Sequence, residues 1–282
     1  MKRAISVLMM LLFIQTALYA AEKNITVTFP AQVEIGQPFL VSIRSESEID
    51  SVTISWQEKE CVLTGDNGTF NVLLGTDLKN AGTGTSELRI SCSLNGQLLE
   101  EKRNIHLITR KYPRENLKVS PEKLTPPASL SERIKREAAL GREAIQTNTP
   151  GSAPVLPLFK PVPGGYSSVY GKSRYLNGQF KGRHGGLDMR AARGSPIKAT
   201  SSGTVVLTGD FWFAGKCIYI DHGAGLISFY CHMSKVSKSK GEKVKRGEVI
   251  GLSGKSGRVT GPHLHFSVSW RGEFFDPAPL LK

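Results

Sequence analysis

The chain has 282 residues, with 37 lysines and arginines against 24 aspartates and glutamates, and a formal net charge of +13 at pH 7. This length suffices for two modest domains, each with its own hydrophobic core. After the first residues no apolar run approaches the length of a membrane span, so the mature chain is expected to contain no transmembrane segment.

Residues 1–20 are typical of a signal peptide for export. Lys2 and Arg3 form a basic start, the run from Ile5 to Ile14 is almost wholly apolar, and cleavage is expected after Ala20. An uncleaved membrane anchor is the alternative interpretation, although the run is short for a span. The sequence therefore predicts a periplasmic or secreted protein.

The positive charge is concentrated in the second half of the chain. Residues 151–282 carry 19 basic and 7 acidic side chains, a net charge of +12, whereas residues 1–150 carry 18 and 17. A strongly basic half indicates attraction to an anionic partner, such as a cell-wall polymer or a membrane surface. The densest basic run, from Lys235 to Arg246, is equally compatible with a solvated loop. Export disfavours nucleic acid as the partner.

The four cysteines are interpreted in the light of this predicted export. Cys61 and Cys92 lie in the first half, Cys217 and Cys231 in the second, and an oxidising compartment favours disulfide bonds. We expect the pairs Cys61–Cys92 and Cys217–Cys231. In a hairpin that turns at Gly223-Ala-Gly225, Cys217 falls directly opposite Cys231, which suits a cross-strand disulfide. Four buried reduced thiols are the alternative.

Residues 21–110 alternate short strand-forming runs with turns, which predicts a β-sandwich. The expected strands have a two-residue periodicity and comprise Ile25–Phe29, Phe39–Ile43, Ser51–Trp56 and Leu88–Cys92. The positions of Trp56, Cys61 and Cys92 loosely resemble those in immunoglobulin-like domains. No residue of this segment is expected to be catalytic, and His106 is interpreted as a structural strand residue.

Residues 111–157 are expected to form a linker that contains one helix. The capping-box pattern Ser129-Leu-Ser-Glu132 opens a predicted helix that runs to Gln146. The side chains expected to share one apolar face of this helix are Leu130, Ile134, Ala138 and Ile145. This face should pack against a domain.

Residues 158–282 combine many glycines with short strand-forming runs. The expected strands are Ile197–Thr200, Gly203–Leu207, Cys217–Asp221, Leu226–Cys231, Glu248–Leu252 and His265–Trp270. The two strands around Gly223-Ala-Gly225 should form a hairpin. The chain is therefore expected to be mainly β in both halves.

Two short motifs suggest a metal site. On an extended strand, the side chains of His263 and His265 point to the same face. His184 and Asp188 are four residues apart across two glycines, so both can reach one metal ion from an irregular turn. With one imidazole of the His263/His265 pair they form a His₂Asp set. Three protein ligands leave a fourth position for water, as in catalytic zinc sites.

A longer series of motifs runs in order through the same segment. These landmarks are Ser168-Val-Tyr-Gly171, Arg174, Asn177-Gly178, His184-Gly-Gly-Leu-Asp188, Gly194-Ser-Pro196, Ile220-Asp-His-Gly223, Tyr230-Cys-His232-Met-Ser234, Val244–Gly247 and Gly261-Pro-His-Leu-His-Phe266. In order and spacing they resemble the lysostaphin/LytM-like zinc metalloendopeptidases, which cut peptidoglycan peptides. The resemblance covers somewhat under half of the chain.

By position, the resemblance implies that His184, Asp188 and His265 are the ligands of one zinc ion. It makes His232 and His263 the two catalytic imidazoles, which activate water and stabilise the tetrahedral oxyanion. The segment contains no H-E-x-x-H glutamate, so a histidine is the available base at neutral pH. The division of proton transfers between His232 and His263 stays open.

Three further residues match positions around the family's site. His222 matches a position outside the metal set and is interpreted as a structural turn histidine. Arg174 and Asn177 precede the metal motif and are candidates for lining the substrate groove. Ordinary turn residues are the equal alternative for both.

The sequence thus predicts a mainly β protein with an N-terminal immunoglobulin-like β-sandwich and a helical linker. The resemblance implies that these are followed by a C-terminal antiparallel β-sheet domain, a peptidase domain of the lysostaphin type. The expected function is that of an exported zinc-dependent endopeptidase, which hydrolyses amide bonds in the stem peptides or crosslinks of peptidoglycan. The alternative is a non-catalytic protein that binds murein or activates another cell-wall hydrolase.

Overall fold

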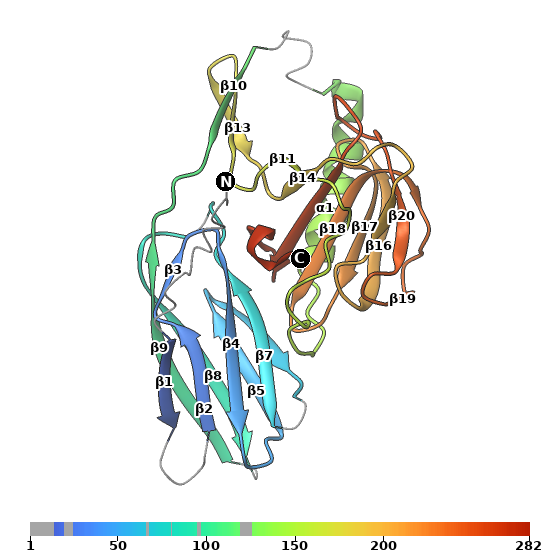
Figure 1. The fold of residues 1–282 in the computed structure, drawn as a ribbon. Helices are drawn as coiled ribbons and strands as arrows, with labels where there is room; N and C mark the ends of the chain where they lie inside the picture. The colour runs from blue at the N-terminus through green and yellow to red at the C-terminus, as the bar shows by residue number, and fades with distance from the viewer. Residues whose placement is uncertain (1–13, 20–24, 66–67, 80, 95–96, 119–125) are drawn as a thin grey trace, which may run out of the picture.

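The computed structural model describes residues 14–19, 25–65, 68–79, 81–94, 97–118 and 126–282. Over these residues the chain is mainly β with one α-helix, and its two β-rich parts lie side by side (Figure 1). None of the helices in this part of the chain has the length and apolar character needed to cross a membrane.

The predicted signal peptide, residues 1–20, lies mostly outside the described residues. Of these twenty, only Ile14–Tyr19 are described, and they form strand β1, which pairs antiparallel with β2 (Ile25–Pro30). Cleavage after Ala20 stays a prediction.

Two sheets form the N-terminal part. The first has the strand order β1-β2-β4-β7 and the second the order β3-β9-β8-β5-β6. The further strands are β3 (Gln32–Glu34), β4 (Pro38–Ser45), β5 (Ser51–Trp56), β6 (Lys59–Leu63), β7 (Thr69–Gly75), β8 (Gly84–Leu94) and β9 (Gln97–Ile108). Residues at alternate positions are buried, so Val27 and Ile43 of the first sheet share an apolar cluster with Ile54 and Ile90 of the second. All four expected strands are present, with His106 exposed on β9. The immunoglobulin-like resemblance stays a prediction.

Residues 111–157, the predicted linker, contain a strand that the sequence did not indicate. β10 (Arg114–Leu117) pairs in parallel with β12 (Ser173–Leu176), which pairs antiparallel with β13 (Gln179–Arg183). The linker therefore contributes an edge strand to the part of the chain that carries the landmark motifs.

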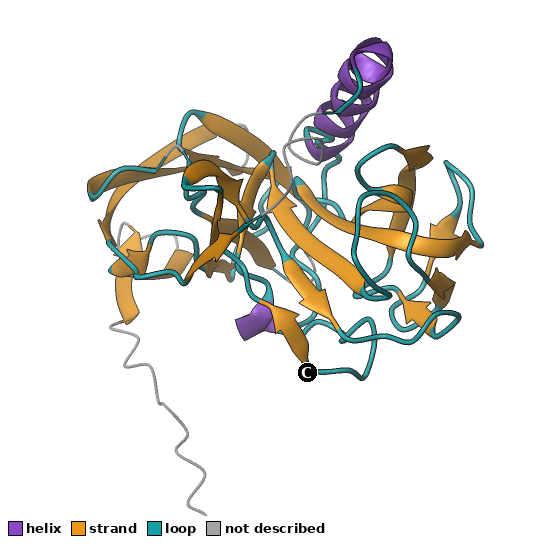
Figure 2. Cartoon of the chain, turned by 90° about the horizontal axis from the view of Figure 1, so that it is seen from above, coloured by secondary structure: helices purple, strands orange, loops and turns teal. Residues whose placement is uncertain are grey.

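The predicted helix is present as α1 (Ser131–Ile145), which follows a 3₁₀ turn, η2 (Ala128–Leu130). The predicted capping box is wrong, because the N-cap position is Leu130 and no side chain caps the first turn. The predicted apolar face is partly wrong, since Ala138 is exposed. Figure 2 shows the helix standing outside the sheets.

A small apolar contact and a buried carboxylate together attach this helix. Ala144, with Ile145 packed beside it, belongs to an apolar cluster with residues of β17 (Gly215–Asp221) and β18 (Leu226–Val236). The buried residues of α1 are Glu137 and Ala144, and the helix contacts β16 (Gly203–Phe211). Glu137 accepts a hydrogen bond of 2.6 Å from Arg133 Nε and another of 2.7 Å from the backbone N–H of Trp212. These bonds satisfy the buried charge and tie the helix to the loop after β16.

The C-terminal part is built on one large sheet. Its main path has the order β11-β14-β21-β18-β17-β16-β19, while β20 pairs with β15 and β18, and β22 pairs with β21. The remaining elements are β11 (Tyr166–Ser168), β14 (Leu187–Met189), β15 (Pro196–Lys198), β17 (Gly215–Asp221), β18 (Leu226–Val236), β19 (Lys243–Val244), β20 (Val249–Ser253), β21 (Leu264–Trp270), β22 (Glu273–Phe275) and η3 (Ala278–Leu280). Each expected strand has a counterpart here, and the predicted hairpin is formed by β17 and β18.

The two β-rich parts share their hydrophobic core. Buried apolar residues of both parts belong to one continuous cluster. At the junction, the ring of Phe275 packs so closely on Gly75 that a Cβ atom there would overlap it. Trp56 Nε1 donates a hydrogen bond of 3.0 Å to the Gly75 carbonyl and supports the same contact.

Both predicted disulfides are wrong: all four cysteines are free and buried. In the second sheet Cys61 lies opposite Ile54 and Cys92 opposite Val52, on the two sides of β5. They are therefore two strand spacings apart, roughly 9.5 Å, which exceeds the reach of a disulfide.

The predicted disulfide between Cys217 and Cys231 is absent for a different reason. The β17–β18 register shifts between Lys216 and Ile218, where a bulge interrupts the ladder. Cys217 and Cys231 therefore lose the direct opposition that a regular hairpin would give them.

Candidate metal centre and catalytic groove

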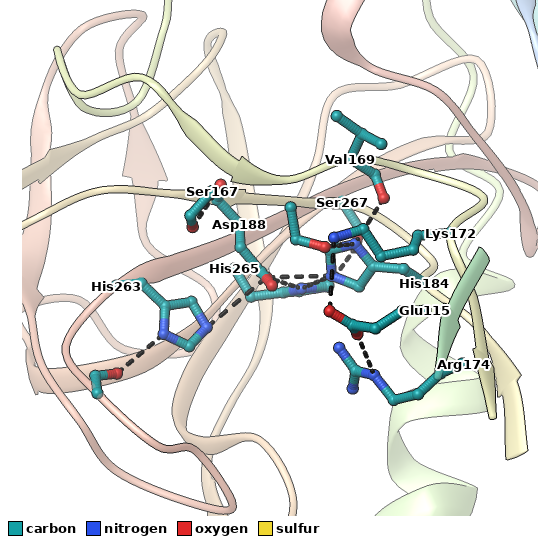
Figure 3. Close-up of polar contacts among 12 residues, drawn as sticks. Glu115, Ser167, Val169, Lys172, Arg174, His184, Asp188, His263, His265 and Ser267 are labelled. Atoms are coloured by element: carbon teal, nitrogen blue, oxygen red, sulfur yellow. Dashed lines mark hydrogen bonds and ion pairs between the residues drawn. The ribbon is translucent and has the colours of Figure 1, made fainter. Parts of the chain in front are cut away.

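Strand pairing brings the metal-ligand candidates together. β14 lies antiparallel to β21, and in their register Asp188 stands directly opposite His265. His184 precedes β14, and its side chain turns toward the same point (Figure 3). The three side chains form a cluster of potential metal ligands.

The spacing of three atoms in this cluster suits a metal ion. His184 Nε2 lies 3.0 Å from Asp188 Oδ1 and 3.0 Å from His265 Nδ1, and the last two atoms are 2.9 Å apart. Zinc holds nitrogen and oxygen ligands at about 2.0–2.2 Å, so tetrahedral ligand atoms lie about 3.3 Å from one another. The donor set therefore fits zinc in both type and spacing.

Hydrogen bonds on the far side of each ring orient the two histidines. His184 Nδ1 donates to the carbonyl oxygen of Val169 at 2.9 Å, which leaves Nε2 to face Asp188. His265 Nε2 lies 2.8 Å from Ser267 Oγ, and its Nδ1 faces the cluster. Partners of this kind fix the tautomer and the ring orientation of metal-binding histidines.

The cluster brings three lone pairs to one point. His184 keeps a proton on Nδ1, which donates to the Val169 carbonyl oxygen, so the neutral ring has no hydrogen on Nε2. Neutral His265 likewise has none on Nδ1 when its Nε2 donates to Ser267 Oγ. These two nitrogens and the Asp188 carboxylate then repel one another unless a cation lies between them. In the other protonation state, where these two nitrogens carry a proton, they donate to the carboxylate instead. Burial raises the cost of ionising Asp188, but these hydrogen bonds from His184 and His265 hold the pKa of its carboxyl well below the usual range.

Two more histidines face this cluster. The ring centroids of His232 and His263 are 4.9 Å apart, and His263 Nε2 lies 3.6 Å from Asp188 Oδ1. His232 Nδ1 donates to the Ser256 carbonyl at 3.0 Å and His263 Nδ1 to the Gly261 carbonyl at 2.9 Å. In the neutral rings, both Nε2 atoms are therefore proton acceptors.

The environment of His232 keeps its ring neutral. Burial, with the nearby positive form of His265, lowers the pKa of His232 to about 4. Its backbone has φ = 63°, in the left-handed region, at the register shift where β18 bulges away from β17. Its N–H donates to the Ala214 carbonyl at 2.9 Å, which stabilises this conformation. The bulge re-aims the side chain toward the site.

The remaining sequence candidates lie in different places. Arg174 lines the cavity beside Asp188 and His263, whereas Asn177 occupies the exposed turn between β12 and β13 and does not line it. His222 hydrogen-bonds to the Ser202 carbonyl at 2.7 Å and lies 2.7 Å from Ser228 Oγ, away from the cluster.

Sequence reasoning missed three features of the site: the role of Ser267, the close packing around Gly186 of the metal motif, and the presence of Glu115. Ser267 follows the motif histidine by two residues, so strand alternation alone places it on the same face and offered a signal. Gly186 lies so close to Ser267 and the Phe266 carbonyl that no side chain fits there. Glu115 comes from the linker strand β10, and no local pattern connects it with the site.

Comparisons with known proteins agree with this geometry. The model for "Peptidase family M23" matches residues 182–277, a range that contains all five candidate residues. Over 89 residues the chain is 45% identical to "Peptidoglycan DD-endopeptidase ShyA" of Vibrio cholerae serotype O1, a match that covers 32% of this chain and 21% of that protein. It is 37% identical over 124 residues to lysostaphin of Staphylococcus simulans, covering 42% of this chain and 25% of lysostaphin. The chain thus spans about a fifth to a quarter of the length of these curated relatives.

One solved structure matches most of the chain. It is described as a peptidase M23 from Pseudomonas aeruginosa, and the match covers 86% of this chain and 92% of that one, at 30% identity and a TM-score of 0.64. With the mainly β fold and the His/Asp cluster, these likenesses define a metallopeptidase and hence a hydrolase. The chain belongs to peptidase family M23, which confirms the resemblance seen in its motifs.

Proposed function

We propose that the chain is an exported zinc-dependent endopeptidase that hydrolyses amide bonds in the stem peptides or crosslinks of peptidoglycan. The observation that carries the proposal is the convergence of His184 Nε2, Asp188 Oδ1 and His265 Nδ1 beside two further imidazoles. The substrate class is supported by two relatives from Vibrio cholerae, ShyA and ShyB, which are both named peptidoglycan DD-endopeptidases.

In this proposal the cluster of His184, Asp188 and His265 holds one zinc ion, which when bound supplies a Lewis acid that polarises the scissile carbonyl. His232 and His263 keep their protons on Nδ1, so Nε2 of either ring can take a proton from the attacking water. The resulting imidazolium then donates a hydrogen bond to the developing oxyanion or a proton to the leaving amine.

The other parts of the chain have proposed roles of their own. Residues 1–20 direct export, and residues 21–110 form an immunoglobulin-like domain that, with the linker 111–157, positions the peptidase domain 158–282 on peptidoglycan. The basic second half attracts an anionic cell-wall or membrane surface. Cell fractionation tests export; retention of the intact chain in the cytoplasm would contradict it.

A digestion experiment tests the enzymatic proposal. Purified protein loaded with zinc is incubated with crosslinked muropeptides, and the products are identified by mass spectrometry. We expect cleavage of an amide bond, its loss on chelation, and the loss of both activity and bound zinc in the His184→Ala variant. The matched control is His106→Ala, which changes an exposed histidine on β9.

The same experiment separates the enzyme from its alternative. A non-catalytic murein-binding protein, or an activator of another hydrolase, would bind muropeptides without cleaving them. Absence of both cleavage and bound metal would refute the enzymatic proposal. Retained cleavage in His184→Ala would show instead that the ligands are misassigned.

A further inference from the structure

A cavity of about 320 Å³ opens beside the metal cluster. Asp188 and His263 form one part of its lining. Four further charged side chains also line it, and these are Glu115, Lys172, Arg174 and Arg190. A peptide bound at the cluster would therefore lie against charged groups that the reaction itself does not use.

The lining carries an excess of positive charge. Lys172, Arg174 and Arg190 are its cations, and Asp188 is already engaged with two histidines. Among the lining residues this leaves Glu115 as the one further carboxylate.

Glu115 is placed between two of these cations. Its Oε1 lies 3.8 Å from Lys172 Nζ, and its Oε2 lies 3.4 Å from Arg174 Nε. Both cations thus face Glu115, Arg174 from β12 and Lys172 from the position just before that strand. Figure 3 shows this carboxylate close to the His/Asp cluster.

The position of Glu115 depends on the linker. In the parallel pairing of β10 with β12, Glu115 is directly opposite Arg174. Glu115 lies outside residues 182–277, the segment matched by the peptidase family. The carboxylate is therefore supplied to the groove by a separate segment of the chain.

Building on the proposed function, we infer that Lys172 and Arg174 form a subsite for a free carboxylate of the peptide substrate, and that Glu115 occupies this subsite in the free protein. An arginine guanidinium matches a carboxylate in geometry as well as charge. The ion pairs of Glu115 are long and partly exposed, so they are weak enough for a substrate carboxylate to displace them. The substrate class is thus an anionic peptide whose free carboxylate lies near the scissile amide.

The test compares two synthetic crosslinked peptides that differ only in one carboxyl group of the diamino acid next to the scissile bond. In one peptide this group is a free carboxylate, and in the other it is an amide. For the zinc-loaded protein we expect KM to be about tenfold lower for the carboxylate peptide, with similar kcat, since charge-assisted hydrogen bonds contribute to binding.

Two variants and one control test whether the difference in KM between the two peptides depends on Arg174 and Glu115. Arg174→Gln should bring the two KM values to within about twofold of each other, because it removes the charged donor. Glu115→Gln keeps the size of the side chain and should lower KM for the carboxylate peptide by about threefold, without affecting the amide peptide. Lys181→Gln, on the exposed part of the adjacent strand β13, should change neither value.

Equal KM values in the unaltered protein, or an Arg174→Gln variant that loses kcat equally on both peptides, would overturn the subsite. Binding of the same labelled peptides in the presence of a chelator, followed by fluorescence anisotropy, is measured in parallel. Tighter binding of the carboxylate peptide without any cleavage by the zinc-loaded protein would support the subsite and refute the endopeptidase. Equal binding of the two peptides would refute the subsite alone.

Discussion

His184 and His265 present opposite ring nitrogens to Asp188. His184 uses Nε2, at 3.0 Å, and His265 uses Nδ1, at 2.9 Å. The choice follows from the partner behind each ring, the Val169 carbonyl for His184 and Ser267 Oγ for His265. The residues behind the rings therefore decide which lone pairs meet at the metal site, so metal affinity should depend on them as well as on the ligands.

Replacing Ser267 with alanine should weaken zinc binding. The variant leaves His265 Nε2 without its 2.8 Å partner, so the tautomer with a free Nδ1 is no longer favoured. We expect zinc affinity to fall by about 10–100-fold, measured by competition with a chromophoric chelator.

Ser269→Ala is the matched control for this change. Ser269 lies two residues further along β21 on the same face and is also buried, but its hydroxyl has no hydrogen-bond partner in the described part of the chain. Its substitution should leave zinc affinity unchanged. Equal losses in the two variants would mean that packing, not the hydrogen bond to His265, determines the effect.

Two adjacent glycines should respond very differently to substitution. A Cβ on Gly186 would collide with the Phe266 carbonyl and Ser267 Oγ and would lie 3.0 Å from His265 Nε2, whereas a Cβ on Gly185 meets nothing within 4 Å. Gly186→Ala should therefore displace β21 and destabilise the fold by about 1–3 kcal/mol.

The measurements for this pair are thermal unfolding and zinc affinity. Gly186→Ala should lower both, while Gly185→Ala should behave as the unaltered protein does. If Gly186→Ala kept full zinc affinity, the close packing of β14 against β21 would not be what positions His265.

Much of the fold follows from residue alternation. The run Ser51–Trp56 buries every second side chain in the structure as its sequence predicts, and the turn at Gly223-Ala-Gly225 does connect two paired strands. Residue alternation alone does not predict that His184, Asp188 and His265 meet. Their meeting, across about eighty residues of sequence, was predicted from the order of motifs that the chain shares with a known family.

The features that escaped prediction depend on tertiary contacts. β10 is a short, polar strand that exists through its pairing with β12, so no local periodicity marks it. The left-handed backbone of His232 shifts the β17–β18 register and removes the expected opposition of Cys217 and Cys231. The burial of Glu137 on the helix also escaped prediction, because it depends on the backbone N–H of Trp212, which lies 75 residues further along the chain.

The stability of the protein should fall in mildly acidic solution partly because of His222. Burial lowers the pKa of His222 in the folded chain below its value of 6.5 in the unfolded chain. Below that pH the unfolded state binds the extra proton, so stability is lost as the pH falls from about 6.5 toward the folded pKa. A single proton gives a slope of at most about 1.4 kcal/mol per pH unit.

Urea unfolding of the unaltered protein and of His222→Gln at pH 7.5 and pH 5 measures this contribution. The variant should show a smaller drop in unfolding free energy between the two pH values. His106→Gln, which replaces an exposed histidine, should show the full drop. An identical pH dependence in His222→Gln would mean that His222 does not couple protonation to folding.

Zinc should raise the thermal stability of the protein, independently of any catalytic activity. Two unprotonated imidazole nitrogens and a carboxylate oxygen lie within 3.0 Å of one another, and a cation converts their mutual repulsion into attraction. At a free zinc concentration of 100 times Kd, the folded state gains about 2.7 kcal/mol. For a chain of this length that unfolds as one unit, the gain corresponds to a rise in Tm of about 4–5 °C.

Differential scanning calorimetry with and without a chelator measures this shift. His184→Ala and Asp188→Ala should each abolish the response to zinc, because two remaining ligands bind the ion far more weakly. His106→Ala should keep the full response, since that histidine lies on β9 in the N-terminal sheets. A rise in Tm that persists in His184→Ala would place the zinc ion at a different set of side chains and would separate metal binding from the His/Asp cluster.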